Sequence, residues 1–235
     1  MKKILSLGGG VQSSCLIYLN VKGVIELDYA VFADTGAEPE YVYQHIEYLK
    51  TIARIPIYTV RAKIDLIADL ERGKMQMPAL INGGKGRLSK HCSMDYKIRP
   101  IYKFIKEREN YKRGDKYEMV IGISSDEQQR ARLTPPPFVN SYPLIFDLQM
   151  NRAACIAYAE NNGFNIPKKS GCVCCPYATK ANADVPYSEI DRVLNDRIET
   201  LARAIRPDAV LNRYINQPDA PPLPSLFECS GYCLT

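Results

Sequence analysis

The 235-residue sequence lacks a long hydrophobic run, a secretory cleavage site, an internal repeat and a strong excess of one charge. No stretch approaches the roughly 18 consecutive apolar residues of a membrane-spanning helix, so we expect no membrane partner. Gly8-Gly9-Gly10 interrupts the apolar residues near the N-terminus, and no small-residue cleavage site follows them. We therefore expect a cytoplasmic protein.

The net charge of +5 arises from 31 basic and 26 acidic side chains spread along the chain. This modest charge is compatible with anionic ligands and does not by itself indicate nucleic acid. Hydrophobic residues make up 46% of the chain, which excludes fibrous, collagen-like and disordered proteins.

Short apolar segments alternate with amphipathic segments along the chain. We expect strands at 3–7, 29–33, 56–60, 118–121 and 142–146, and helices at 13–22, 40–53, 64–71, directly after Pro100, 152–162 and 188–204. Residues 73–91 are expected to form a loop. Strands that alternate with helices predict an α/β fold with a doubly wound, mostly parallel sheet.

A glycine loop follows the first predicted strand. Gly8, Gly9 and Gly10 let backbone N–H groups approach an anion, and the next helix presents the positive end of its dipole. Ser13 and Ser14 can cap that helix or donate to a phosphate oxygen. The loop is neither a Walker A motif nor the usual dinucleotide fingerprint. It predicts a phosphate site, and a tight turn with serine caps is the alternative.

Polar residues also follow other predicted strands. Asp34-Thr35-Gly36 ends the second strand, where a carboxylate could bind a ribose or a metal, or only shape the turn before the next helix. Lys97, Arg99 and Arg130 could neutralise phosphate or sulfate. A solvated charged face is the alternative for Lys97 and Arg99, and ion pairing with Asp126-Glu127 would explain Arg130 equally well.

The eight cysteines indicate metal binding or thiol chemistry rather than disulfides, because we expect a reducing compartment. Cys15 and Cys155 lie in apolar helical patterns and are interpreted as core residues. Cys172 and Cys175 form a C-x-x-C pair that can share a metal or cluster. Further ligands must come from Cys92, Cys174, Cys229 or Cys233. Zinc held by two local pairs is an alternative to an iron–sulfur cluster.

Six motifs occur in one order along the chain. They are the glycine loop ending in Gln12-Ser13, Phe32–Gly36, His91–Pro100, Gly122–Glu127, Gly171–Pro176 and Glu228–Cys233. Together they resemble the phosphoadenylylsulfate (PAPS) reductase-like branch of the PP-loop superfamily, in particular members found in phages and bacteria. The resemblance implies an adenine nucleotide alpha hydrolase-like fold with residues 8–14 as the phosphate loop.

Several site assignments follow from this resemblance. In ATP-cleaving members an aspartate of the loop helps to hold magnesium and pyrophosphate, whereas here Gln12 takes that position, as in sulfonucleotide reductases. The resemblance implies a cluster, expected to be 4Fe-4S, on Cys92, Cys172 and Cys175, with Cys174 as fourth ligand and Cys233 competing. It also implies a nucleophilic thiol at Cys229, within a motif that matches the family imperfectly, and Cys233 could then resolve the product.

We divide the chain into a nucleotide-binding α/β core at 1–150 and a helical, cysteine-rich segment at 151–235 that packs on the core within one structural domain. The leading hypothesis is an iron–sulfur enzyme that binds an adenine nucleotide and carries out sulfur chemistry, closest to adenylyl sulfate reduction. Its expected partners are a sulfonucleotide and a thiol electron donor. The ligands of the nucleotide would be Gly8, Gly9, Gly10, Gln12, Ser13, Ser14, Asp34 and Arg130, and Lys97 and Arg99 would assist catalysis.

Two other functions fit the same motifs. An ATP pyrophosphatase could adenylate a base or nucleotide and replace its oxygen with sulfur, although Gln12 counts against it. A zinc-stabilised module could bind a nucleotide or nucleic acid without turnover.

Overall fold

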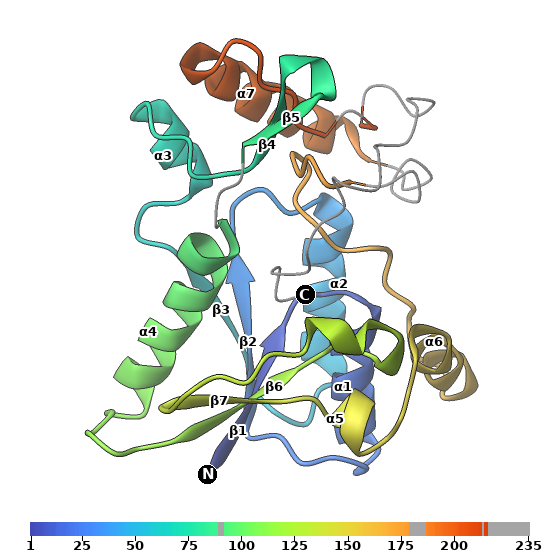
Figure 1. The fold of residues 1–235 in the computed structure, drawn as a ribbon. Helices are drawn as coiled ribbons and strands as arrows, with labels where there is room; N and C mark the ends of the chain where they lie inside the picture. The colour runs from blue at the N-terminus through green and yellow to red at the C-terminus, as the bar shows by residue number, and fades with distance from the viewer. Residues whose placement is uncertain (89–91, 179–186, 213, 216–235) are drawn as a thin grey trace.

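The computed structural model describes residues 1–88, 92–178, 187–212 and 214–215. Its central sheet has five parallel strands in the order β3-β2-β1-β6-β7 (Figure 1). The strands are β1 (Lys2–Leu7), β2 (Tyr29–Asp34), β3 (Ile57–Arg61), β6 (Tyr117–Ile121) and β7 (Phe138–Ser141). The prediction of a doubly wound α/β fold with a parallel sheet is confirmed.

Helices cover both faces of this sheet because its strands are apolar on both sides. Leu5 and Leu7 of β1 share one hydrophobic cluster with residues of α1 (Val11–Val21), α2 (Glu40–Ile52) and α6 (Arg152–Asn161). Ile4 belongs to another cluster with residues of α4 (Arg99–Arg108). Alternate residues of a strand point to opposite faces, so one short apolar run supplies both cores. Cys15 and Cys155 are fully buried in the first cluster, which confirms that they are core residues.

A second layer lies beyond the carboxyl ends of the strands (Figure 1). It contains α3 (Leu66–Glu71), the strands β4 (Ala79–Ile81) and β5 (Gly86–Leu88), and α7 (Glu189–Ile205), which share a separate hydrophobic cluster. Asp191 of α7 joins the two layers, because its carboxylate caps α7 and also accepts from the backbone N–H of Glu40 at 2.9 Å.

Two expectations about local structure are wrong. Residues 73–91 are not only a loop, because β4 and β5 pair as an antiparallel hairpin, and the backbone of Leu80 pairs with Val210. Residues 142–146 are not a strand: β7 ends at Ser141, and Pro143 begins the short helix α5 (Pro143–Phe146). Proline has no backbone N–H for a strand ladder and is favoured in the first helical turn.

Other elements lie close to their predicted positions. The helix after Pro100 begins at Arg99 and is preceded by a π-helical turn at Met94–Ile98. Within the described part of the chain, no helix combines the length and the apolarity needed to cross a bilayer.

Candidate functional site

A cavity of about 740 Å³ lies at the carboxyl ends of the parallel strands, and Leu66 of α3 in the second layer also lines it. Gly10 after β1, Thr35 after β2 and Glu127 after β6 all line it. Ligands bind at this edge of open α/β sheets. The remaining lining comprises Val11, Gln12, Ser13, Leu66, Met77, Pro78, Cys92, Ser93, Tyr96, Lys97, Gln129, Arg130, Arg132, Arg152, Lys169, Ser170, Gly171, Cys172, Cys174, Cys175, Pro176 and Tyr177.

The glycine loop presents backbone donors to this cavity. Gly10 precedes α1 in an extended conformation and offers no side-chain cap. The hydroxyl of Ser13 donates to the carbonyl of Gly10 at 3.2 Å and accepts from the N–H of Gly8 at 3.3 Å, which closes the loop on itself. Ser14 N is the first amide of α1 to be bonded, to Gly10 O at 2.9 Å.

Three backbone N–H groups of the first turn of α1 have no acceptor among the described residues. They belong to Val11, Gln12 and Ser13, which all line the cavity. Such unsatisfied amides, together with the helix dipole, favour a bound anion.

The end of β6 approaches the backbone of this loop very closely. A Cβ atom at Gly122 would lie 2.7 Å from the N atom of Ser13 and 2.8 Å from its Cα atom. Only a residue without a side chain fits there. Gly9 is restricted in another way, because its φ of +70° lies in the left-handed region that favours glycine.

Gln12 is held on both sides of its amide. Its Nε2 donates to Glu127 Oε2 at 2.9 Å and to Ser124 Oγ at 3.3 Å, and its Oε1 accepts from the guanidinium of Arg152 at 3.0 Å. Gln12 therefore links the loop to the turn after β6 and to the start of α6.

The predicted basic residues fall into two groups. Lys97 and Arg130 line the cavity, where Lys97 forms an ion pair with Glu38 at 3.2 Å and Arg130 forms one with Glu127 at 2.7 Å. Arg99 does not line the cavity; it is exposed and pairs with Asp95 on the same helical turn. Ion pairing within residues 126–130, one of the sequence interpretations, thus occurs without removing Arg130 from the cavity.

Sequence reasoning missed three basic residues of the cavity wall, Arg132, Arg152 and Lys169. None of them belongs to a recognisable motif. Arg152 is the first residue of α6, and only its position after a predicted loop could have suggested that it faces the ends of the strands.

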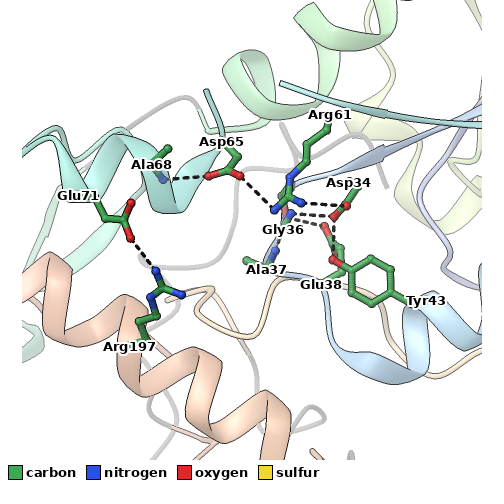
Figure 2. A network of polar contacts seen from close by, with 11 residues as sticks. Asp34, Gly36, Ala37, Glu38, Tyr43, Arg61, Asp65, Ala68, Glu71 and Arg197 are labelled. Carbon is green, nitrogen blue, oxygen red and sulfur yellow. Dashed lines mark hydrogen bonds and ion pairs between the residues drawn. The ribbon is translucent and has the colours of Figure 1, made fainter. Parts of the chain in front are cut away.

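Asp34 does not line the cavity and shapes the turn after β2. Its Oδ1 accepts from Gly36 N at 2.8 Å and from the Tyr43 hydroxyl at 2.7 Å, and its Oδ2 lies 3.8 Å from the guanidinium of Arg61 (Figure 2). Arg61 also pairs with Asp65 at 3.1 Å. The structure thus places Asp34 in the turn-forming role, while its neighbour Thr35 lines the cavity.

Four cysteines form one wall of the cavity: Cys92, Cys172, Cys174 and Cys175. The Sγ atom of Cys172 lies 3.4 Å from Thr35 Oγ1 and donates to Glu38 Oε1 at 3.6 Å. Burial raises the pKa of the Cys172 thiol, and the charge of Glu38 raises it further. Burial also raises the pKa of Cys174, which is 1% exposed, with Cys175 and Cys92 near enough to add to the effect.

The thiol wall has the donor chemistry of an iron–sulfur or zinc site, since thiolates are the preferred ligands of both. A bound cation would also offset the burial that holds the Cys172 and Cys174 thiols in their neutral form. Within the described ranges, no three histidine, cysteine or acidic side chains are already arranged around one metal position. The candidates Cys229 and Cys233 lie outside those ranges.

His45 of α2 contacts the end of the glycine loop on the side that does not face the cavity. Its Nε2 lies 2.9 Å from the hydroxyl of Ser14, which is fully buried and does not line the cavity. Burial lowers the pKa of His45 to about 4, so the imidazole is neutral near pH 7.

The lowered pKa predicts a loss of stability in acid. The unfolded chain takes up a proton near pH 6.5, whereas folded His45 takes it up only near pH 4, so its contribution is complete above pH 6.5 and declines as the pH falls towards 4. His45→Asn keeps a hydrogen-bonding group and does not titrate. Urea unfolding from pH 8 to 4 should show the wild type losing stability relative to His45→Asn only below about pH 6.5. Parallel curves would contradict the buried, neutral histidine.

No family model and no curated protein matches this chain. Among solved structures, it is similar to PAPS reductase from Candida auris in a phosphate complex, with 11% sequence identity, a TM-score of 0.50, and coverage of 72% of this chain and 76% of that one. It is also similar to the U34-tRNA thiolase NcsA from Methanococcus maripaludis with its 4Fe-4S cluster, with 15% identity, a TM-score of 0.44, and coverage of 87% of this chain and 70% of that one.

The likeness to the reductase shows the fold. The five-stranded parallel sheet with helices on both faces is the adenine nucleotide alpha hydrolase-like fold, as the resemblance of the sequence motifs implied.

Proposed function

We propose that this protein binds an adenine nucleotide at the glycine loop and carries out sulfur chemistry on it, with sulfonucleotide reduction as the closest reaction. One observation carries the proposal: the amides at the start of α1 and the four cysteines of the thiol wall open onto the same cavity. A candidate anion site and cysteine thiols thus line one cavity.

The cavity suits a nucleotide in size and in chemistry. Its volume of about 740 Å³ lies within the range of small-molecule sites. The α1 amides, Lys97 and Arg130 would neutralise the phosphate or sulfate. Leu66 and Met77 add apolar surface on which an adenine ring can lie. In this proposal residues 1–150 supply the nucleotide site, and 151–235 bring most of the cysteines to it.

Cys92, Cys172 and Cys175 would hold an iron–sulfur cluster, with Cys174 as the fourth ligand and Cys233 as its competitor. When bound, such a cluster supplies electrons, or an open iron that binds sulfur. Lys97 and Cys172 both contact Glu38. The positive charge of Lys97 would therefore favour the Cys172 thiolate that a metal requires.

Cys229 is the proposed nucleophile on the basis of its motif alone. Attack of its thiolate on the sulfur of an adenylyl sulfate would form a sulfur–sulfur bond, leave the sulfonate group on Cys229, and break the sulfur–oxygen bond to release AMP. A second thiol, from Cys233 or an external donor, would then form a disulfide with Cys229 and release sulfite. Both tail cysteines are outside the described residues.

Metal analysis and ligand binding test the proposal together. The protein is purified without oxygen, its iron, sulfide and zinc are measured, and binding of AMP and adenosine 5′-phosphosulfate is followed by calorimetry. We expect iron and sulfide with broad visible absorbance, binding of both nucleotides, and sulfite release with a thiol donor. Pyrophosphate release from ATP that depends on an acceptor would favour thiolation instead. Zinc without turnover would favour the binding module.

A further inference from the structure

We propose that Arg152 binds the anionic group of the nucleotide and that Gln12 is a positioning residue that holds the Arg152 guanidinium in place. This inference rests on the proposed nucleotide site and names a residue that no motif identifies. It also reassigns the side chain of Gln12 from direct ligand binding to a supporting role, while its backbone N–H stays in the anion site.

The side-chain amide of Gln12 is already occupied. A primary amide has two donor hydrogens and one acceptor oxygen. Both donors are used, towards Glu127 and Ser124, and the oxygen accepts from Arg152. The orientation of the amide follows from its neighbours, because a flipped amide would turn its NH₂ group towards a guanidinium and its oxygen towards a carboxylate. The side chain of Gln12 has no donor left for a phosphate oxygen.

Arg152 is held at both ends. Its backbone N–H donates to Asp126 Oδ1 at 3.1 Å, and its guanidinium donates to Gln12 Oε1 at 3.0 Å. A side chain fixed at its base and near its tip loses little conformational entropy when a ligand arrives. The guanidinium is therefore preorganised where it lines the cavity.

The charge of Arg152 is available to a ligand. Within the described part of the chain, no carboxylate oxygen lies within 4.0 Å of its guanidinium, whereas Lys97 pairs with Glu38 and Arg130 with Glu127. Guanidinium has five N–H donors in a planar fork, and the bond to Gln12 uses one. The others can donate to two oxygens of one phosphate or sulfate.

Arg152 and the α1 amides are brought together by Gln12 itself. The backbone N–H of Gln12 is one of the amides without an acceptor, and its side chain holds Arg152. An anion at the first turn of α1 would thus contact the backbone N–H of Gln12, at the positive end of the helix dipole. It would also contact the Arg152 guanidinium that the Gln12 side chain holds. The three side-chain hydrogen bonds of Gln12, with Glu127, Ser124 and Arg152, account for a neutral glutamine that is only 9% exposed at this position of the loop.

The test compares an anionic with a neutral ligand. Arg152→Gln should weaken binding of AMP and of adenosine 5′-phosphosulfate about tenfold or more, the effect of one charge-assisted hydrogen bond. Binding of adenosine, which carries no anion, should stay the same. Arg54→Gln is the matched control, since exposed Arg54 does not line the cavity and its loss removes one charge from elsewhere.

The role of Gln12 is measured by a double-mutant cycle. Gln12→Ala should weaken AMP binding in the wild type and have no further effect on AMP binding in the Arg152→Gln background, because it acts through Arg152. A purely structural loss would weaken adenosine and AMP alike. If Arg152→Gln does not fold, Arg152→Lys serves instead, since an ammonium lacks the planar fork of parallel N–H groups that binds two oxygens of one anion.

The outcomes separate this inference from the proposed function. Wild-type affinity for AMP in a folded Arg152 variant, or additive effects in the cycle, would overturn the inference while nucleotide binding stands. Failure of the wild type to bind any adenine nucleotide would overturn both.

Discussion

Replacement of Gly122 by alanine should disrupt the anion site and lower the free energy of unfolding by about 3 kcal/mol, the range of overpacking in a rigid region. The added Cβ would lie 2.7 Å from the backbone N of Ser13 and 3.1 Å from the backbone carbonyl carbon of Gln12. No side-chain rotamer can relieve a contact between backbones. The loop must move, and the amides of α1 that face the cavity must move with it.

Urea denaturation and AMP titration measure these two effects of Gly122→Ala separately. Gly163→Ala is the control: its φ is +71°, so alanine there is strained, but its Cβ would meet no atom within 4 Å and the residue does not line the cavity. We expect that control to cost about 1 kcal/mol through backbone strain alone and to bind AMP normally. Equal losses of stability and normal AMP binding in both variants would contradict the close approach of β6 to the loop.

Replacement of single cysteines in the thiol wall should remove the metal. Cys92→Ser, Cys172→Ser and Cys175→Ser are each expected to lose most of the bound iron and the visible absorbance, because a serine hydroxyl does not replace a thiolate at iron. Cys174→Ser tests the fourth position. If Cys174→Ser keeps the cluster, the fourth ligand comes from elsewhere, with Cys233 as the first candidate.

Cys155→Ser is the matched control for these variants. Cys155 is fully buried, like Cys174, and packs with Cys15 between α1 and α6 away from the cavity. Its loss should lower stability and leave the iron content per folded chain unchanged. Full iron content in all four wall variants, or iron loss in Cys155→Ser to the same extent, would contradict a cluster on this wall.

The Cys229→Ser variant should keep iron and lose sulfite release.

The central sheet was predictable because its information is local. Apolar runs such as 29–33 need no knowledge of distant residues to be assigned as strands buried on both faces, and helical periodicity identified α2 and α7 within a residue or two at their starts. The hairpin of β4 and β5 was missed because strands of three residues carry too little periodicity, and its backbone is completed by the distant Val210. The strand expected at 142–146 was wrong because Pro143 was given too little weight.

The candidate site divides in the same way. Gly8 to Ser14 and the Cys172–Cys175 pair were found from spacing, since loops and C-x-x-C pairs are contiguous. Arg152 was not, because its importance depends on Gln12, 140 residues earlier in the chain. Asp34 shows the converse: a carboxylate at the right strand end looks like a ligand in sequence, and its bonds to Gly36 and Tyr43 decide its direction.

Three properties could be read from the amino-acid sequence: a parallel α/β sheet, a glycine loop before the first helix, and cysteines set outside the apolar segments. Those properties depend on residues that are neighbours in the chain or repeat with a fixed period. The folded structure was needed to show that the loop and four cysteines line one cavity, that Arg152 lines it too, and that Asp34 does not. The direction of a side chain depends on partners brought together by folding. Those partners lie too far apart in the chain for a local sequence pattern to predict them.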